Sequence, residues 1–429
     1  MLGDLCGLRT FLGHYGMTLN IQETSEVLGN VTGGMKRGFD YDGLTQMTLQ
    51  LDTQHAFNWY GGTFNVSGLQ VHGDNLSAEN LGSLQTASGI EADRGARLWE
   101  LWYDQKLLNE DKLDIKIGQQ SLDQEFMVSS NALLFVNTMF GWPMVPSADL
   151  PGGGPAYPLS DLGVRAQWKT PIDSVKILAG VFNGSPVRNN DAADSQRADR
   201  WGTSFLLNGG VLAIGEIQYS YQGLGARSYG DSSSKLSGTY RLGAWYDSEK
   251  FADQRYDNTG LSLADQNTTG VARLHKGNYS IYGVADQMIM RSSRDPNRNL
   301  SVFARAMGTP QSDRNLIDFS VNAGFNLTDP LPYRADDTFG IGVGYAHVSS
   351  SVVGLAADTG LNNPGAFIPQ GRAETFVEMT YQMQLYPWIL LQPDIQYLVH
   401  PGGGVANPNN PSQLIKNELV VGARTIIQF

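Results

Sequence analysis

The chain has 429 residues, a formal net charge of -12 and only 17% charged residues. Phosphate backbones need clustered Lys and Arg, and the sequence has no basic run, which excludes a nucleic-acid partner. The single cysteine, Cys6, excludes an internal disulfide framework and a cysteine-rich metal site. A stretch of about 18 apolar residues is also missing, which excludes a transmembrane helix but leaves open a barrel, whose strands need about ten residues.

The rest of the composition favours a large sheet with many turns. Glycine occurs 50 times and aromatic residues make up 10% of the chain, as suits tight turns and the aromatic girdles of a membrane barrel. The chain starts without the charged and apolar segments of a secretory signal, and we expect that signal to have been removed. Residues 1–14 are expected to form an N-terminal periplasmic or plug segment, and residues 15–429 the barrel.

Alternation of apolar and polar residues recurs along the chain. Three apolar residues alternate with Thr18, Asn20 and Gln22, and the same period of two returns at 46–52, 113–118 and 377–385. This period puts the two sets on opposite faces of a strand, and many segments exceed the usual soluble length of about five or six residues. We predict antiparallel strands at 15–29, 41–57, 61–73, 96–106, 111–121, 161–169, 173–183, 201–222, 236–248, 278–290, 299–308, 314–327, 337–350, 372–386, 388–400 and 415–429.

The strand count depends on the segment 201–222, which could be split at Asn208-Gly209-Gly210. A split would give an odd number of strands and would reverse the direction in which every later strand crosses the membrane. The short links near 58–60, 107–110 and 170–172 fall on the same side as the link at 386–388 only if the segment is one bulged strand. Bacterial barrels have even strand numbers, short periplasmic turns and long outer loops. The sequence therefore predicts an all-β transmembrane barrel of 16 strands, with 18 as the fallback.

The longer connections are predicted to lie outside the cell, where Gly, Asn, Asp, Ser and Pro suit solvated loops. They are 74–95, 122–160, 184–200, 249–277, 351–371 and 401–414; the inner link 223–235 is unusually long and the outer link 309–313 unusually short. The segment 122–160 differs from the others because it contains several aromatic residues. We expect this loop to fold into the lumen as a constriction. A cap on the outer surface, or a contact in a trimer, is the alternative.

Several short segments, in order and spacing, resemble the carbohydrate-selective porins of the OprB family. They lie at 3–12, 15–19, 238–246, 285–287, 302–306, 386–397 and 401–403, so the resemblance runs nearly end to end. The chain departs from the family at Leu5-Cys6, where an aromatic residue and a glycine are more usual. The resemblance implies a 16-stranded barrel of the Gram-negative outer membrane that passes small sugars such as glucose by diffusion.

A sugar pore must exchange water for protein donors and acceptors on the sugar hydroxyls, stack its aromatics on the pyranose rings, and still bind weakly. Strand alternation assigns polar residues to the inner face, because charges facing lipid at mid-depth are costly. Asp286 and Gln287 are adjacent and cannot both point inward without a bulge. The predicted pore-lining and constriction residues are Arg241, Arg305, Glu100, Glu378, Trp245, Arg165, Gln382, Asp394, Phe126 and Trp142; Arg–Glu pairs that only stiffen the barrel wall are the alternative role.

Aromatic residues on the outer face are expected to form girdles at the membrane surfaces. They are Trp99, Tyr103, Trp168, Tyr246, Trp388 and Tyr397. The C-terminal Phe429 is expected to be read by the barrel-assembly machinery, and outer-membrane lipid and lipopolysaccharide are the expected surroundings.

No catalytic or metal-binding motif stands out. Six scattered histidines lack zinc spacing, so no cofactor is expected. The acidic stretch 189–194 lacks the order of a calcium loop, although calcium among outer-loop carboxylates stays open. His347 and Ser349 could share one face, as in a barrel hydrolase, but lack an orienting third group. The alternative functions are a channel for another polar solute or for an exported polysaccharide, a barrel enzyme, and a soluble carbohydrate-binding protein.

Overall fold

The computed structural model describes residues 2–187, 194–207, 209–224, 236–293, 295 and 297–429. Strands dominate it, with short helices in the connections. The helices are α1 (Leu8–His14), α2 (Thr53–Phe57), α3 (Thr138–Gly141), α4 (Met144–Asp149), α5 (Ser195–Ala198) and α6 (Ser350–Asn362), with short helical turns at Ser77–Leu81, Asn109–Asp111, Ala132–Leu134, Pro151–Gly153 and Pro401–Gly403. The strands are β1 (Met17–Gly34), β2 (Gly38–Asp52), β3 (Gly62–Gly73), β4 (Gly95–Leu107), β5 (Leu113–Gln120), β6 (Asp161–Lys169), β7 (Val175–Asn183), β8 (Val211–Leu224), β9 (Leu236–Asp257), β10 (Ala272–Arg291), β11 (Asn299–Gly308), β12 (Ile317–Thr328), β13 (Thr338–Val348), β14 (Ala373–Tyr386), β15 (Ile389–Val399), β16 (Ala406–Asn407), β17 (Asn410–Leu414) and β18 (Lys416–Gln428).

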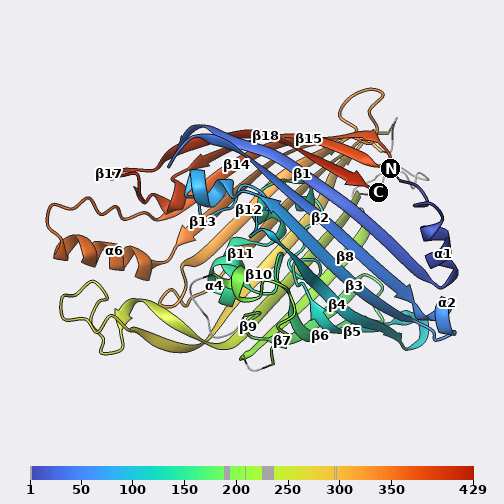
Figure 1. Ribbon diagram of the computed structural model, residues 1–429, viewed down its shortest axis with the longest axis horizontal. Helices are drawn as coiled ribbons and strands as arrows, with labels where there is room; N and C mark the ends of the chain where they lie inside the picture. The colour runs from blue at the N-terminus through green and yellow to red at the C-terminus, as the bar shows by residue number, and fades with distance from the viewer. Residues whose placement is uncertain (1, 188–193, 208, 225–235, 294, 296) are drawn as a thin grey trace.

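Within the described residues, sixteen strands close into one antiparallel barrel. Consecutive strands β1 to β15 pair in order, β18 pairs with β15, and β18 also pairs with β1 to close the sheet. The small strands β16 and β17 form a separate two-stranded sheet in the connection between β15 and β18. The predicted fold class and strand number are therefore confirmed, and Figure 1 shows the barrel in side view with its tilted strands.

The strands alternate between an inner and an outer face. On β9, Leu242 and Tyr246 are 62% and 47% exposed, whereas Trp245 and Asp247 are 2% and 0% exposed. The outward residues are apolar along most of the sheet, which is the pattern of a barrel whose outside meets lipid. None of the helices in the described residues is long and apolar enough to cross a membrane.

The two ends of the barrel differ. Both chain termini lie at the end that carries α1 and α2, whereas α6 and the extended β9–β10 hairpin project from the other end (Figure 1). The short links between β2 and β3, β4 and β5, β6 and β7, and β14 and β15 all lie at the end with the termini, as predicted. Short turns mark the periplasmic end of bacterial barrels, so the long loops are extracellular.

Several predicted strand boundaries are wrong. Residues 201–207, 209 and 210 are not in a strand, because β8 begins only at Val211, although the described part of 201–222 does contain a single strand. The predicted strand 41–57 ends at Asp52, whose side chain accepts bonds from the backbone N–H groups of Gln54 and His55 and starts α2. The strands β9 and β10 continue well beyond the predicted ends, and α6 occupies most of the predicted loop 351–371. Most of the long inner link, 225–235, lies outside the described residues.

Trp99 corrects the prediction for the outer face. The pairing of β3 with β4 shifts register between Ser67 and Gly68, so that the bulge turns both Trp99 and Glu100 away from lipid. Trp99 is only 4% exposed and packs edge-on against Tyr157, with ring centroids 6.4 Å apart. Simple alternation missed this position because a bulge adds one residue to the period.

Candidate solute pathway

The loop between β5 and β6 (residues 121–160, called the inner loop below) fills much of the lumen. Its aromatic residues form a core with the barrel wall. The rings of Phe135 and Phe140 stack with centroids 4.4 Å apart, and Phe140 meets Phe376 of β14 at 5.4 Å. Phe135 also lies 5.6 Å from Phe303 of β11. The predicted inward folding of this loop is thus confirmed, and its apolar side chains explain why it leaves water.

Carboxylates on the inner wall hold the inner loop by its backbone. Glu378 accepts bonds from the N–H groups of Val136 at 2.6 Å and Asn137 at 3.0 Å. Glu216 accepts from Met127 at 2.9 Å. Asp286 accepts from Ser129 Oγ at 2.6 Å, from the backbone of Ser130 and Asn131 at 3.3 and 3.2 Å, and from Asn131 Nδ2 at 3.0 Å; Glu100 accepts from Ser121 at 3.0 Å. Buried N–H groups without such acceptors would be costly, so these acids anchor the loop.

Arg305 is the cationic counterpart of these anchors. Its guanidinium donates to the carbonyl oxygens of Met127 and Gly141, both at 2.9 Å, and to Met139. It also donates to Asn322 Oδ1 on β12 at 3.2 Å, and the residue is 1% exposed. One side chain therefore ties three carbonyls of the inner loop to the wall.

A second extracellular loop, between β3 and β4, also enters the lumen. Glu374 of β14 accepts bonds from the N–H groups of Leu84 at 2.8 Å and Gln85 at 2.7 Å. Backbone bonds then join this loop to the inner loop, from Gly89 to the carbonyl of Val136 at 2.9 Å and from Thr138 to that of Thr86 at 3.1 Å. The two loops together form one packed insert on the extracellular side.

A row of charges lies on the inner face of β4, β5 and β6. Arg165 forms ion pairs with Asp114 and with Glu125 of the inner loop, and it lies 4.0 Å from Asp104. Lys116 pairs with Glu125 and sits 4.4 Å from the centre of the Trp102 ring. Three carboxylates and two cations give this row a formal net charge of -1.

The predicted pore-lining residues all lie on the inner face or in the inner loop, but most are covered. Gln382 is half-buried, and the Arg241 side chain is 11% exposed and bonded to Asp286 at 2.8 Å. The remaining predicted residues are buried, at 9% exposure or less: Arg305, Glu100, Glu378, Trp245, Arg165, Asp394, Phe126 and Trp142. Their contact with a solute stays a prediction, while their contacts with the loop and wall are direct.

Sequence reasoning missed three of the anchors, Glu216, Asp286 and Glu374, as loop-holding residues. Each sits at an inward position of a strand, and that signal was available. What the sequence lacks is any sign of which inward acid meets a loop, because those contacts join residues as far apart as Gln85 and Glu374. The segment 74–95 also lacks the aromatic content that marked the inner loop.

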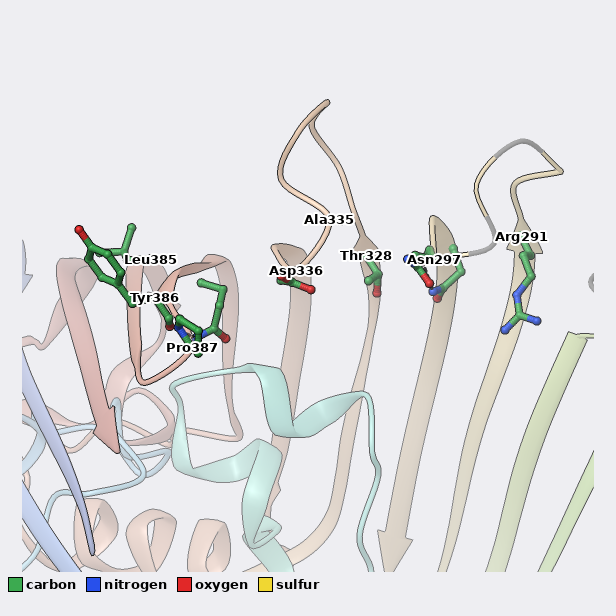
Figure 2. Close-up of a pocket in the computed structure, with 10 residues that line it drawn as sticks. Arg291, Asn297, Thr328, Ala335, Asp336, Leu385, Tyr386 and Pro387 are labelled. Carbon is green, nitrogen blue, oxygen red and sulfur yellow. Dashed lines mark hydrogen bonds between the residues drawn. The ribbon is translucent and has the colours of Figure 1, made fainter. Parts of the chain in front are cut away.

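The periplasmic end opens into a polar cavity of about 840 Å³. It is lined by strand ends and turns from β10 to β15, among them Arg291, Asn299, Thr328 and Gln384. Figure 2 shows Arg291 and Thr328 at strand ends, Asp336 in the turn before β13, and Tyr386 and Pro387 in the next turn along the rim. The barrel thus widens into a water-accessible vestibule below the packed insert.

The minor motifs have structural partners. His347 Nδ1 lies 2.6 Å from Asp318 Oδ1, whereas Ser349 caps α6 through the N–H of Val352. The described residues contain no group of three or more His, Cys, Asp or Glu side chains arranged to hold a metal. The acidic stretch 189–194 lies outside the described residues except for Asp194.

A closed sixteen-stranded barrel with an apolar outside, loops packed in its lumen and a wet periplasmic vestibule defines an outer-membrane porin. The family model "Carbohydrate-selective porin, OprB family" matches residues 36–429. The chain belongs to the OprB family of carbohydrate-selective porins, and it is a sugar-uptake channel of the Gram-negative outer membrane. The predicted family, function and location are confirmed.

Curated relatives agree with this assignment. The chain is 25% identical to Porin B of Pseudomonas aeruginosa, over 94% of this chain and 87% of the relative. It is 22% identical to the Putative porin QuiX of Acinetobacter baylyi, over 94% of this chain and 89% of the relative. Among solved structures, the high-pH structure of Pseudomonas putida OprB superposes with a TM-score of 0.82 at 24% identity, covering 100% of this chain and 98% of that one. This structural likeness supports the fold.

Proposed function

We propose that the channel passes small neutral sugars such as glucose by passive diffusion, through a path bounded by the inner loop and ending in the periplasmic vestibule. The observation that carries this proposal is the packed insert of two loops above a polar vestibule. Because the insert is fixed to the wall by Glu378, Arg305 and Glu374, the narrow part is preformed. A preformed opening suits diffusion without an energy source.

The chemistry of the vestibule fits hydroxylated solutes. Gln384 and Asn299 line it, and the inner face of the strands carries further half-buried amides: Gln46, Gln50, Gln167, Gln218 and Gln382. Each amide both donates and accepts hydrogen bonds, so a sugar hydroxyl can exchange water for protein at little net cost. Weak, repeated contacts of this kind let a solute leave as easily as it enters.

The charge of the channel favours neutral solutes over anions. The chain carries a net charge of -12, and the row around Arg165 has one more carboxylate than it has cations. A negative field lowers the local concentration of anions. Gln382, Arg241 and the row around Arg165 are the side chains we propose to meet the solute. Gln382 is half-buried, and the side chains of Arg241 and of the row keep 7% to 17% exposure, whereas Arg305 and Glu378 are fully covered.

The ends of the chain support further proposals about partners. Phe429 donates its N–H to the carbonyl of Ile21 at 3.0 Å, and Arg9 donates to the Phe429 carbonyl. This arrangement ties the segment 2–14 to the periplasmic end of the barrel. We propose that Phe429 is the residue read by the assembly machinery, and that lipid and lipopolysaccharide surround the outer face. Calcium among outer-loop carboxylates remains an expectation.

Liposome swelling tests the proposal. Liposomes with the purified protein are compared in isosmotic glucose, an amino acid, a disaccharide and gluconate, with protein-free liposomes as the control. We expect glucose to enter faster than gluconate of nearly the same size. Equal or faster entry of gluconate would overturn the proposed preference for neutral sugars.

A further inference from the structure

The helix α1, at the periplasmic end of the barrel, has two chemically different sides. Successive residues of an α-helix are turned by about 100°. The apolar residues of α1 and of its C-terminal cap therefore fall within one stripe about 100° wide, which is called the apolar stripe below: Leu8, Phe11, Leu12 and Tyr15. The other side carries Arg9, Thr10, Gly13 and His14. The helix is thus amphipathic.

The apolar stripe faces away from the protein. Leu8, Phe11 and Tyr15 are 43%, 58% and 51% exposed, and every residue of α1 keeps part of its surface accessible. On a surface helix of a water-soluble protein, such a stripe would face the core. The rings of Phe11 and Tyr15 contact each other with centroids 5.3 Å apart, so the stripe forms one continuous apolar surface.

The polar side fixes α1 to the end of the barrel. Arg9 donates to the carbonyl oxygen of Leu19 on β1 at 3.3 Å and to that of Phe429. The backbone N–H and the hydroxyl of Thr10 donate to Asp4 Oδ1 at 2.7 and 3.0 Å. These bonds hold the helix in one rotation about its axis, so the fold itself sets the outward direction of the stripe.

The apolar stripe adjoins the lipid-facing surface of the barrel. Gly16 alone separates Tyr15 from the first residue of β1. On β2, Met47 faces outward and is 53% exposed, and side chains two residues apart on a strand share a face. The outward pairs of β1 and β2, followed toward the periplasmic end, are therefore Ile21 with Met47, Leu19 with Leu49, and Met17 with Leu51.

Aromatic side chains mark the membrane surface at this end of the barrel. The link after α2 carries the exposed rings of Trp59 and Tyr60, and Trp59 packs edge-on against Tyr103 of β4 with centroids 6.5 Å apart. Such rings gather where lipid headgroups meet acyl chains. The two helices α1 and α2 lie at the same end (Figure 1), and Asp52, the cap of α2, donates its N–H to the carbonyl of Gly16 at 2.9 Å. The helix α1 is therefore at the level of the headgroups.

Phospholipid suits both sides of α1. Apolar rings that face water are unfavourable, and the nearby vestibule is mainly polar, with Arg291 and Gln384 in its lining. Acyl chains next to the headgroups offer the stripe an apolar cover, while headgroups and water meet the polar side. A helix divided in this way lies in the plane of the membrane surface.

We propose that α1 is an interfacial helix that binds phospholipid of the periplasmic leaflet, with Leu8, Phe11 and Tyr15 inserted at the boundary of headgroups and acyl chains. Because Arg9 joins α1 to β1 and to Phe429, lipid binding holds the first strand and the end of the last strand at the membrane surface. The proposal rests on the outer-membrane location of the barrel and is independent of which solute passes through it.

Spin labels test the proposal on the full chain in liposomes of phosphatidylethanolamine and phosphatidylglycerol. In a Cys6→Ser background, Phe11→Cys places a nitroxide on the stripe. The matched control Gly13→Cys places one on the other side of α1, where an added side chain meets open space. Collision rates are measured with oxygen, which concentrates in lipid, and with a nickel chelate, which stays in water. We expect the ratio of oxygen to nickel collisions to be about threefold higher or more at Phe11→Cys.

The two collision rates also identify any other neighbour of the stripe. Equal ratios at Phe11→Cys and Gly13→Cys would overturn the proposal, because the stripe would then face the same medium as the polar side. Low rates with both reagents at Phe11→Cys would overturn it too, because protein would cover the stripe. Labels at Leu8→Cys and Tyr15→Cys should repeat the result of Phe11→Cys, and the gel mobility of unheated samples checks that each barrel is folded. Neither negative result would bear on sugar passage, which the swelling assay measures separately.

Discussion

Replacing Arg305 by Met distinguishes two roles of this residue: anchoring the inner loop and contacting the solute. The substitution keeps the unbranched apolar stem of the side chain but leaves three carbonyls, those of Met127, Gly141 and Met139, without their donor. A buried unpaired acceptor costs about 1–3 kcal/mol, or about 3–9 kcal/mol for three. Relief of the several kcal/mol needed to bury a guanidinium offsets part of this cost, which leaves about 2–4 kcal/mol against the inserted loop.

A loss of 2 kcal/mol changes the ratio of inserted to released loop about 30-fold. In planar bilayers we expect Arg305→Met to give higher single-channel conductance and more open-channel noise than the unchanged channel. Arg291→Met is the matched control, because it removes the same charge from the vestibule without contact to the loop. Unchanged conductance and noise in Arg305→Met, with only sugar block altered, would refute the anchoring role and favour direct solute contact.

Three further changes test other parts of the structure. Deleting 126–144 removes the core of the inner loop and should raise conductance; an unchanged value would mean that the loop is not the narrow part. Trp99→Ala should lower the free energy of unfolding of the barrel by about 3–5 kcal/mol. Trp168→Ala, at a site 43% exposed, should lower it much less, and equal effects of the two substitutions would argue against the buried position of Trp99. Arg255→Gln breaks the pair with Asp358 at 2.8 and 2.9 Å and should speed protease cutting in α6. The Arg255 hydrogen bond and charge lower the pKa of Asp358, so protection of α6 should be full above about pH 4 and lost as the pH falls through that lowered pKa; equal cutting at neutral and strongly acid pH would contradict it.

Alternation predicted the barrel wall because one face meets lipid and the other meets water or packed loops. The prediction failed where that contrast ends. The residues 249–257 and 272–277 extend β9 and β10 at the extracellular end. There Asp253 and Asp257 are buried although they are polar, and α6 binds Arg255 through Asp358, so burial no longer follows the alternation of apolar and polar residues. Around Trp99 the contrast persists, but the bulge shifts its phase.

The sequence predicted which side chains of the candidate site face inward, but not what those side chains contact. Inward positions such as Glu378 and Arg305 followed from period two, because a charge on the lipid face is costly. Whether such a side chain meets a solute or a loop depends on contacts over long distances in sequence, such as that between Val136 and Glu378. Glu23 on β1 shows the opposite limit. It faces outward although charges are expected to face inward, and its carboxylate contacts Ser25, Thr45 and His72 on β1, β2 and β3.

Block of the ion current by sugar tests most directly whether a carbohydrate travels through this lumen. With single channels in a planar bilayer, glucose added to one side should reduce the current in a saturable, concentration-dependent way, and gluconate at the same concentration should reduce it less. A current that glucose leaves unchanged up to osmotically limiting concentrations, or that gluconate blocks more strongly, would contradict a neutral-sugar pathway.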